Sequence, residues 1–214
     1  MESLALYLSA PIAGFRAPHA REYLETLPCP PPSTVYGALL SLVGETRRAR
    51  HSGVELAIAM LSRPQRSVVL RSVWRIKEAR ALDPGQGENV RPDYQELLVD
   101  VRVAVWVRPG KDEQIPSLVT RLAEALRTPA SVDRFGGLAL GESTHLVDEA
   151  RELRDTDGRI GEFLVRDGMG SLTLPVWPDH VGSAGTGWQQ LRLEKRSLAG
   201  APHDDCWIRI EPMR

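Results

Sequence analysis

Cysteine is scarce, because the 214-residue chain has only Cys29 and Cys206. They form no C-x-x-C pair and no histidine cluster lies near them in the sequence. The sequence therefore indicates neither a disulfide framework nor a zinc site. No segment approaches the roughly 18 apolar residues of a membrane-spanning helix, and the residues after Met1 lack the basic start of a secretory signal. We expect a cytoplasmic protein with no membrane partner, metal or cofactor.

Lysine is also rare: Lys77, Lys111 and Lys195 are the only three, so 24 of the 27 basic residues are arginine. A GC-rich genome explains this bias as well as selection for phosphate-binding guanidinium groups does. The net charge is −1, which by itself does not indicate a nucleic-acid partner. However, residues 46–80 hold nine basic side chains against two acidic ones, so this part of the chain is locally cationic.

Hydrophobic patterns predict an α+β chain. Leu4, Leu6 and Leu8 alternate with other residues, as in a strand with a buried face. Further strands are predicted at 54–61, 66–77, 96–107 and the end of 134–149, with helices from Ser33 to near Gly44 and at 115–126. This order is the β-α-β-β-α-β plan of a ferredoxin-like domain with its central hairpin extended into an arm. Residues 10–32 are predicted to form a long loop with a helical turn around 21–27.

The pattern weakens beyond residue 150. Residues 150–162 are predicted to be a charged connection, and short strands are expected at 171–177, 190–193 and 206–211. We therefore divide the chain into a ferredoxin-like domain at 1–149, with an arm at about 63–96, and a less regular extension at 150–214. This C-terminal, β-rich part is expected to pack on the core.

The predicted arm has one basic face. In an extended strand, Arg71, Arg75 and Lys77 lie on one side, and Trp74 lies on the other. Cations that follow phosphates and flat side chains that stack on bases are the features that hold single-stranded RNA. A solvated edge strand protected by its charges is the alternative. We interpret Trp74 as packing beneath the arm rather than stacking on a base.

Prolines 28, 30, 31 and 32 precede the first predicted helix and restrict the end of the long loop. Ser33 is expected to cap that helix. Gly37 is costly inside a helix, which favours a position where another backbone comes close, either the sheet beneath or a partner above. Tyr36 either stacks on that partner or completes the core.

Five segments of the chain form a recognisable series, and together they span most of residues 4–149. They are LYLSAPIAGFR, PCPPPSTVYGALLSLVGE, RPQRSVVLRSVWRIK, RPDYQELLVDVRVAVWV and RFGGLALGESTHLVDE. In this order they resemble the Cas-five family of CRISPR-associated proteins, particularly its DevS-like branch. The resemblance fades after about residue 150.

This resemblance implies an RRM/RAMP-type ferredoxin-like subunit of a Cascade surveillance complex in antiviral defence. Such a subunit grips the 5′ handle of CRISPR RNA and caps the backbone filament. Its β-hairpin thumb packs against the neighbouring backbone subunit, and another surface meets the large subunit, so that target DNA is contacted only through the complex. One branch of the family instead cleaves the precursor RNA.

We expect the RNA-binding surface to combine the arm, the loop after the first strand, the region around the first helix and the glycine-rich stretch at 134–145. That stretch exposes backbone amides, although a bulged strand entry is the alternative, and its G-G-x-x-x-G spacing fits neither a dinucleotide fingerprint nor a P-loop. The expected contacts are Arg16, Arg21, Tyr36, Arg47, Arg71, Arg75, Lys77, Arg134, Gly136, Gly137, Ser143 and His145.

No catalytic residue is predicted. RNA cleavage without metal needs a general base and a general acid that converge, and metal-dependent cleavage needs paired carboxylates. His19 and Tyr23 share a face only if the loop is helical there, and no carboxylate cluster is present in the sequence. The alternatives to a non-catalytic RNA-binding subunit are a metal-independent endoribonuclease of the same fold and an α+β protein-interaction domain without RNA.

Overall fold

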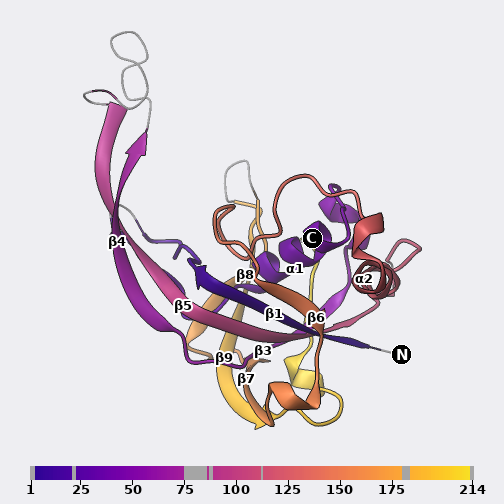
Figure 1. Cartoon of the computed structure of the whole chain (residues 1–214). Helices are drawn as coiled ribbons and strands as arrows, with labels where there is room; N and C mark the ends of the chain where they lie inside the picture. Colours follow the sequence, from indigo (N-terminus) through magenta and orange to yellow (C-terminus); the bar gives the residue numbers. More distant parts are fainter. Residues whose placement is uncertain are drawn as a thin grey trace.

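The computed structural model describes residues 3–20, 23–74, 86, 89–111, 113–179 and 184–212. Figure 1 shows a twisted sheet, two helices on one of its faces, and a two-stranded arm that projects from it. None of the helices in these ranges is long and apolar enough to cross a membrane. The predicted α+β class, with a mostly antiparallel sheet and two helices, is confirmed.

The helices are α1 (Pro32–Leu42) and α2 (Leu118–Arg127), and short 3-10 turns follow several elements, among them η1 (Arg48–His51). The strands of the described residues are β1 (Leu4–Ala13), β2 (Tyr23–Leu24), β3 (Glu55–Met60), β4 (Gln65–Trp74), β5 (Val90–Arg108), β6 (Glu149–Glu152), β7 (Ile160–Arg166), β8 (Leu172–Trp177), β9 (Gly187–Ser197) and β10 (Ile208–Arg209).

The sheet has the strand order β6-β1-β5-β3-β7-β9-β8, and these neighbours are antiparallel. β5 lies at its centre, where Val105 is opposite Leu6 of β1 and Ile58 of β3. The fourth strand of the predicted plan is β6, which spans the expected boundary at 149/150. β7 then pairs directly with β3, so the sheet continues into the last third of the chain.

The period-2 pattern of the central strands buries both faces of the sheet. Val103 and Val105 of β5 join Leu6 and Leu8 of β1 in a cluster that the helices cover. Trp106, between the valines, faces the other way and stacks on Phe163 of β7 at 5.2 Å between ring centroids. Such strands lack the polar face of a half-exposed sheet, which explains their continuous apolar sequences.

Both helices begin differently from the prediction. Pro31 is the N-cap of α1 and Pro32 its first residue, with no side-chain cap, so Ser33 lies inside the helix. Proline suits this first position because its φ is already helical and its missing N–H would have no helical partner. α2 starts at Leu118, where the Ser117 hydroxyl accepts a bond from the Thr120 N–H. Ile115, expected on the buried face, precedes this helix and is almost fully exposed.

The segment after β1 contains no helical turn over its described residues 23–27. Tyr23 and Leu24 instead form β2, which pairs in parallel with Tyr94 and Gln95 of β5. Residue 26 closes the preceding loop, since the Phe15 N–H donates to the Thr26 hydroxyl at 2.9 Å. Backbone pairing with β5 therefore replaces the local hydrogen bonds of a helical turn.

The arm consists of β4 paired with the first half of β5, from Gln65 opposite Val99 to Trp74 opposite Val90. β5 therefore begins six residues before the predicted strand at 96. Trp74 is 70% exposed, so the interpretation that it packs beneath the arm is wrong. A two-stranded ribbon has no layer under it, as Figure 1 shows, and an aromatic side chain near its tip remains open.

In the last third, β8 agrees with the predicted strand, whereas β9 is longer than the predicted 190–193 and β10 is shorter than 206–211. β7 was not predicted, because it lies partly within the segment interpreted as a charged connection. Its Gly161, Phe163, Leu164 and Val165 are buried between β3 and β9. The described residues of this part form most of β6 and all of β7, β8, β9 and β10.

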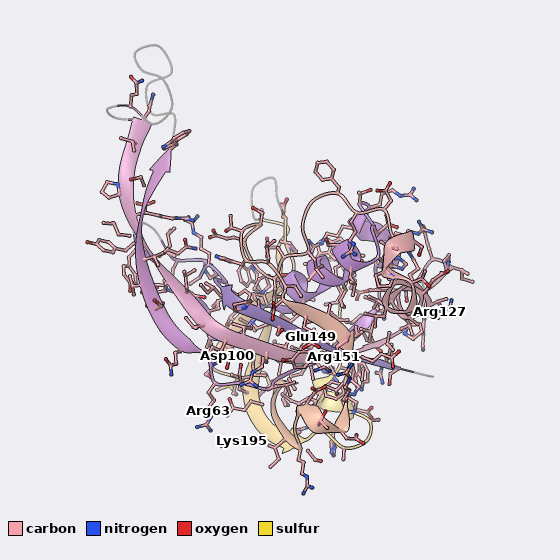
Figure 2. All side chains as sticks on the ribbon, in the orientation of Figure 1. Arg63, Asp100, Arg127, Glu149, Arg151 and Lys195 are labelled. Carbon is pink, nitrogen blue, oxygen red and sulfur yellow. The ribbon has the colours of Figure 1, made fainter. Side chains whose placement is uncertain are left out.

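Asp100 lies where the arm leaves the core, as Figure 2 shows. Its φ is 63°, in the left-handed region that a non-glycine residue seldom occupies. The Ser62 hydroxyl donates to the Asp100 carbonyl at 2.6 Å, and the Arg102 guanidinium donates to its carboxylate at 2.9 Å. Pairing with β1 continues on both sides, through Val99 and Val101. The backbone of β5 therefore changes direction at Asp100, while the residues on both sides remain paired with β1.

Asp100→Val is expected to lower the free energy of unfolding by about 1–2 kcal/mol, because a β-branched residue is strained at positive φ. Asp100→Gly relieves that strain and loses only an exposed ion pair, so its stability should be equal or higher. Urea unfolding of both variants measures this. Equal stability for valine and glycine would show that the left-handed conformation is not retained.

Candidate nucleic-acid interface

A hollow of about 570 Å³ lies between α1, the end of β1 and the glycine-rich stretch. It brings together Arg16, Gly137 and Ser143, three predicted contacts that are far apart in the sequence. Gly37 of α1 and Arg48 of η1 also line it. The predicted proximity of the loop after the first strand to the 134–145 stretch is confirmed by these shared walls.

His145 fastens the glycine-rich stretch to β1. Its Nδ1 accepts from the Gly14 N–H at 3.1 Å and from the Glu142 N–H at 3.2 Å, so the ring proton resides on Nε2. The residue is only 8% exposed, and burial lowers the pKa of its imidazole. His145 was predicted to contact RNA, but it lies beneath the loop because two backbone donors need an acceptor there.

Gly141 allows the close approach that His145 stabilises. Its φ is 109°, and an added Cβ would lie 2.7 Å from the carbonyl oxygen of Gly14. No other residue fits that space without moving the backbone of one segment. The glycine-rich stretch is therefore held rigidly against β1 at this point.

Glu142 links the same stretch to the arm. Its carboxylate accepts from the Arg71 guanidinium at 3.1 Å and from the Gln95 amide at 2.7 Å, one residue from each strand of the arm. Arg71 was predicted to bind phosphate, but in this structure its charge is paired with Glu142. The half-exposed Arg71 therefore joins the arm to the groove wall instead of standing free on a basic face.

The arginines after α1 have unequal roles. Arg50 donates to Glu45 at 3.0 Å and Arg121 donates to it at 2.5 Å, while the predicted contact Arg47 is exposed and 3.9 Å from the same carboxylate. Although burial raises the pKa of Glu45, hydrogen bonds from the Arg47 N–H and the Arg121 guanidinium lower it to about 2. Arg48 is the one of these arginines that lines the groove.

Tyr36 does not lie on the candidate interface. Its side chain is fully buried, and its hydroxyl donates to the Arg48 carbonyl at 2.6 Å. Of the two predicted roles, completing the core is therefore correct and stacking on a partner is wrong. The face of α1 that is open to the groove carries Gly37 instead, where an added Cβ would meet nothing within 4 Å.

The remaining predicted residues of the glycine-rich stretch lie at its surface. Gly136 and Gly137 are exposed, Gly136 with a φ of 80°, and Arg134 is half-buried. Between them Phe135 is 98% exposed, which sequence reasoning missed although the aromatic residue stands beside two glycines. Arg21, Arg75 and Lys77 lie outside the described residues, so their predicted contacts stay predictions.

The described residues show no convergence of the suggested catalytic pair. His19 is paired with Glu25 at 2.5 Å, whereas the Tyr23 hydroxyl donates to Glu96 at 3.2 Å. Tyr23 lies in β2, so the helix face that would align it with His19 is absent. Within the same part of the chain, no group of three or more His, Cys, Asp or Glu residues is arranged to hold a metal ion.

Two solved structures share this α+β fold. A chain titled "CRISPR RNA-guided surveillance complex" has a TM-score of 0.64 at 16% sequence identity, covering 95% of both chains. A second, titled "Crystal structure of Cas protein", has a TM-score of 0.50 at 12% identity, covering 92% of this chain and 95% of the other. The fold class is therefore one found among CRISPR-associated proteins.

Sequence comparison identifies the family. Residues 3–159 match the family model Cas_Cas5d, described as "CRISPR-associated protein (Cas_Cas5)". The "CRISPR-associated protein Cas5" of Myxococcus xanthus (strain DK1622) is 46% identical over 195 residues, which is 90% of each chain. The chain belongs to the Cas5 (Cas-five) family of CRISPR-associated proteins. The DevS-like branch stays a prediction.

Acidification should loosen the glycine-rich stretch. An unfolded histidine titrates near pH 6.5, and burial lowers the pKa of His145 in the folded chain, with Arg71 lowering it further and Glu142 opposing both. The stability gained from neutral His145 is therefore complete above about pH 6.5 and is lost as the pH falls toward its folded pKa. Unfolding free energies between pH 7.5 and 5.5 should decrease more for the wild type than for His145→Gln. Parallel profiles would contradict this.

Proposed function

We propose that the chain is a non-catalytic CRISPR RNA-binding subunit of a type I Cascade-like surveillance complex in the cytoplasm. It holds the 5′ handle of the CRISPR RNA and caps the backbone filament in antiviral defence. The large subunit is a further partner, and target DNA is reached only through the complex. The family membership and the fold support this proposal.

The observation that carries the proposal is the groove at the base of the arm. Arg16 is exposed at its edge, with its guanidinium donating to the Ala20 carbonyl at 3.1 Å, and Arg48 lies in its wall. The hydroxyls of Thr34, Ser41 and Ser143 also line it. Cations and neutral donors of this kind position a phosphate backbone without reading its sequence.

The connectivity also supports an RNA-binding role. The element order β1-α1-β3-β5-α2-β6 and the strand order β6-β1-β5-β3 support a ferredoxin-like, RRM/RAMP-type core. In this chain both sheet faces are covered, so the sheet surface used by RNA-binding domains with exposed aromatic residues is not open. RNA is therefore held at the edge of the core, between α1 and the glycine-rich stretch.

The arm provides a surface for the neighbouring backbone subunit. It exposes large apolar side chains on both of its strands, which are Val68, Val69, Leu70, Trp74 and Tyr94. Exposed apolar side chains gathered on one projecting element are typical of a protein-binding surface. The proposed thumb therefore binds its partner through these residues, while the Arg71 and Glu142 pair fixes its base.

Arg16→Gln should weaken binding of single-stranded RNA that carries the repeat-derived handle. Each lost phosphate contact lowers the slope of log affinity against log salt by about 0.7 for a single strand. Arg127→Gln removes an exposed charge at the end of α2, away from the arm in Figure 2, and serves as the matched control. Fluorescence anisotropy across a salt series measures both variants. Weak binding by the wild type, with the same salt slope for Arg16→Gln and Arg127→Gln, would favour a protein-interaction domain that does not bind RNA.

Repeat RNA incubated with the purified chain in EDTA should remain intact, because His19 and Tyr23, the suggested catalytic pair, bind different carboxylates and do not converge. Denaturing gels over several hours measure cleavage. A site-specific product that disappears in His19→Ala would establish the alternative, a metal-independent endoribonuclease of the same fold.

The double substitution Leu70→Ser and Trp74→Ala should leave the melting temperature nearly unchanged, because both side chains are exposed. It should nevertheless reduce copurification with the backbone subunit. Met169→Ala, which alters an exposed residue outside the arm, is the control. Full recovery of the complex with the double variant would exclude the arm as the contact surface.

A further inference from the structure

Arg48 is held without an acceptor for part of its guanidinium. Its central carbon lies 4.9 Å from the ring centroid of Trp177 and 5.6 Å from that of Tyr36. Nε and one terminal nitrogen are buried and make no hydrogen bond within the described part of the chain. Since buried donors without an acceptor are unfavourable, this arrangement favours an acceptor from outside the chain.

The nearest acidic groups of the groove are already neutralised. Glu45 is bound by Arg50 and Arg121, and Glu142 is bound by Arg71. No carboxylate in the described residues forms an ion pair with Arg48, which is pinned instead against two aromatic rings. Such stacking fixes the plane of a guanidinium, and Arg48 lines the groove without a charged partner from the described residues.

Two hollows meet at Arg48. The groove described above contains Arg16 and Ser143, and a second hollow of about 470 Å³ lies toward Phe135. Both are lined by Gly37, Ser41 and Arg48. The shared residues place the two hollows next to each other over α1, and two adjoining hollows suit a chain better than a small ion. We call the line from the first hollow to the second the path over α1.

Gly37 is the residue that keeps this path clear. Glycine inside a helix lowers its stability, and here no packing demand explains it, because a Cβ would touch nothing within 4 Å. Any longer side chain at this position would project between the two hollows. Glycine at this position therefore makes α1 less stable, and the only gain is that no side chain blocks the path.

Phe135 stands at the far end of the path. It is 98% exposed and lines the second hollow with Gly37 and Arg48. A single exposed aromatic ring beside a cationic groove is the arrangement on which nucleic-acid bases stack.

We propose that single-stranded RNA crosses α1 at Gly37, with one phosphate bound by Arg48 and one base stacked on Phe135. This path rests on the proposed function and assigns a separate role in it to each of three residues. Arg48 supplies the charge, Gly37 the clearance, and Phe135 the stacking surface. The three act on different parts of the same nucleotide segment.

Gly37 provides the sharpest test, because stability and binding should change in opposite directions. Gly37→Ala and Gly37→Met both improve helix propensity, so both should melt at or above the wild-type temperature. Only methionine is long enough to block the path. The affinity of the full chain for repeat-derived single-stranded RNA should fall at least tenfold in Gly37→Met and stay within about threefold of the wild type in Gly37→Ala.

Arg48→Gln should lower the affinity roughly tenfold and reduce the salt slope by about 0.7, with Arg127→Gln as the control. Phe135→Ala should lower the affinity roughly tenfold without changing the slope, Phe135→Trp should restore it, and Met169→Ala should have no effect. Inorganic phosphate at millimolar concentration should not displace the RNA, since a single ion makes only one of the contacts.

The outcomes separate the two proposals. If Arg48→Gln, Phe135→Ala and Gly37→Met all bind RNA like the wild type while Arg16→Gln binds weakly, the path over α1 is wrong and the proposed function stands. If the wild type binds the RNA no more tightly than an unrelated protein does, the proposed function itself fails. Displacement by inorganic phosphate would reduce the site to a simple anion site and would also overturn the path.

Discussion

The continuous pairing of β5 is the constraint on which the rest of the structure depends. Its second half is the centre of the sheet, between β1 and β3, and its first half is one strand of the arm. A shift of one residue would move Val103 and Val105 out of the cluster beneath the helices and onto the face of Trp106, so the side-chain pattern around Val103 fixes its register. Because the same backbone enters both parts, the packing of the core also determines where the arm begins.

A short series of hydrogen bonds connects the arm to the wall of the groove. Arg71 and Gln95 of the arm bind the Glu142 carboxylate, and the Glu142 N–H donates to His145, which also accepts from Gly14. The glycine-rich stretch is therefore attached near its C-terminal end both to the arm, through Glu142, and to the end of β1, through His145. The groove wall is formed before any ligand arrives, which reduces the entropy cost of binding.

The sequence predicted the elements whose pattern is local and periodic, such as the alternation in β1 and the apolar face of α2. The sequence could not predict which other elements pack against a given side chain. Tyr36 and Trp74 are both aromatic residues in regular elements, yet one is buried and the other open, because α1 packs on the sheet and β8 whereas the arm has no layer beneath it. Arg47 and Arg48 are adjacent and chemically identical, and the turn at η1 decides which one faces the groove. β7 was missed because Gly161 and Glu162 interrupt the apolar pattern of this short buried strand.

Asp100 gives the arm a mechanical property. From Val90 to Asp100 the strand runs for ten residues, which is about 33 Å at 3.3 Å per residue. With this lever length, a change of about 10° in the strand direction at Asp100 would displace Val90 by about 6 Å. Pairing with β1 and β2, and the bonds of Arg71 and Gln95 to Glu142, oppose such a change, so the arm is a stiff lever whose direction is set by the core.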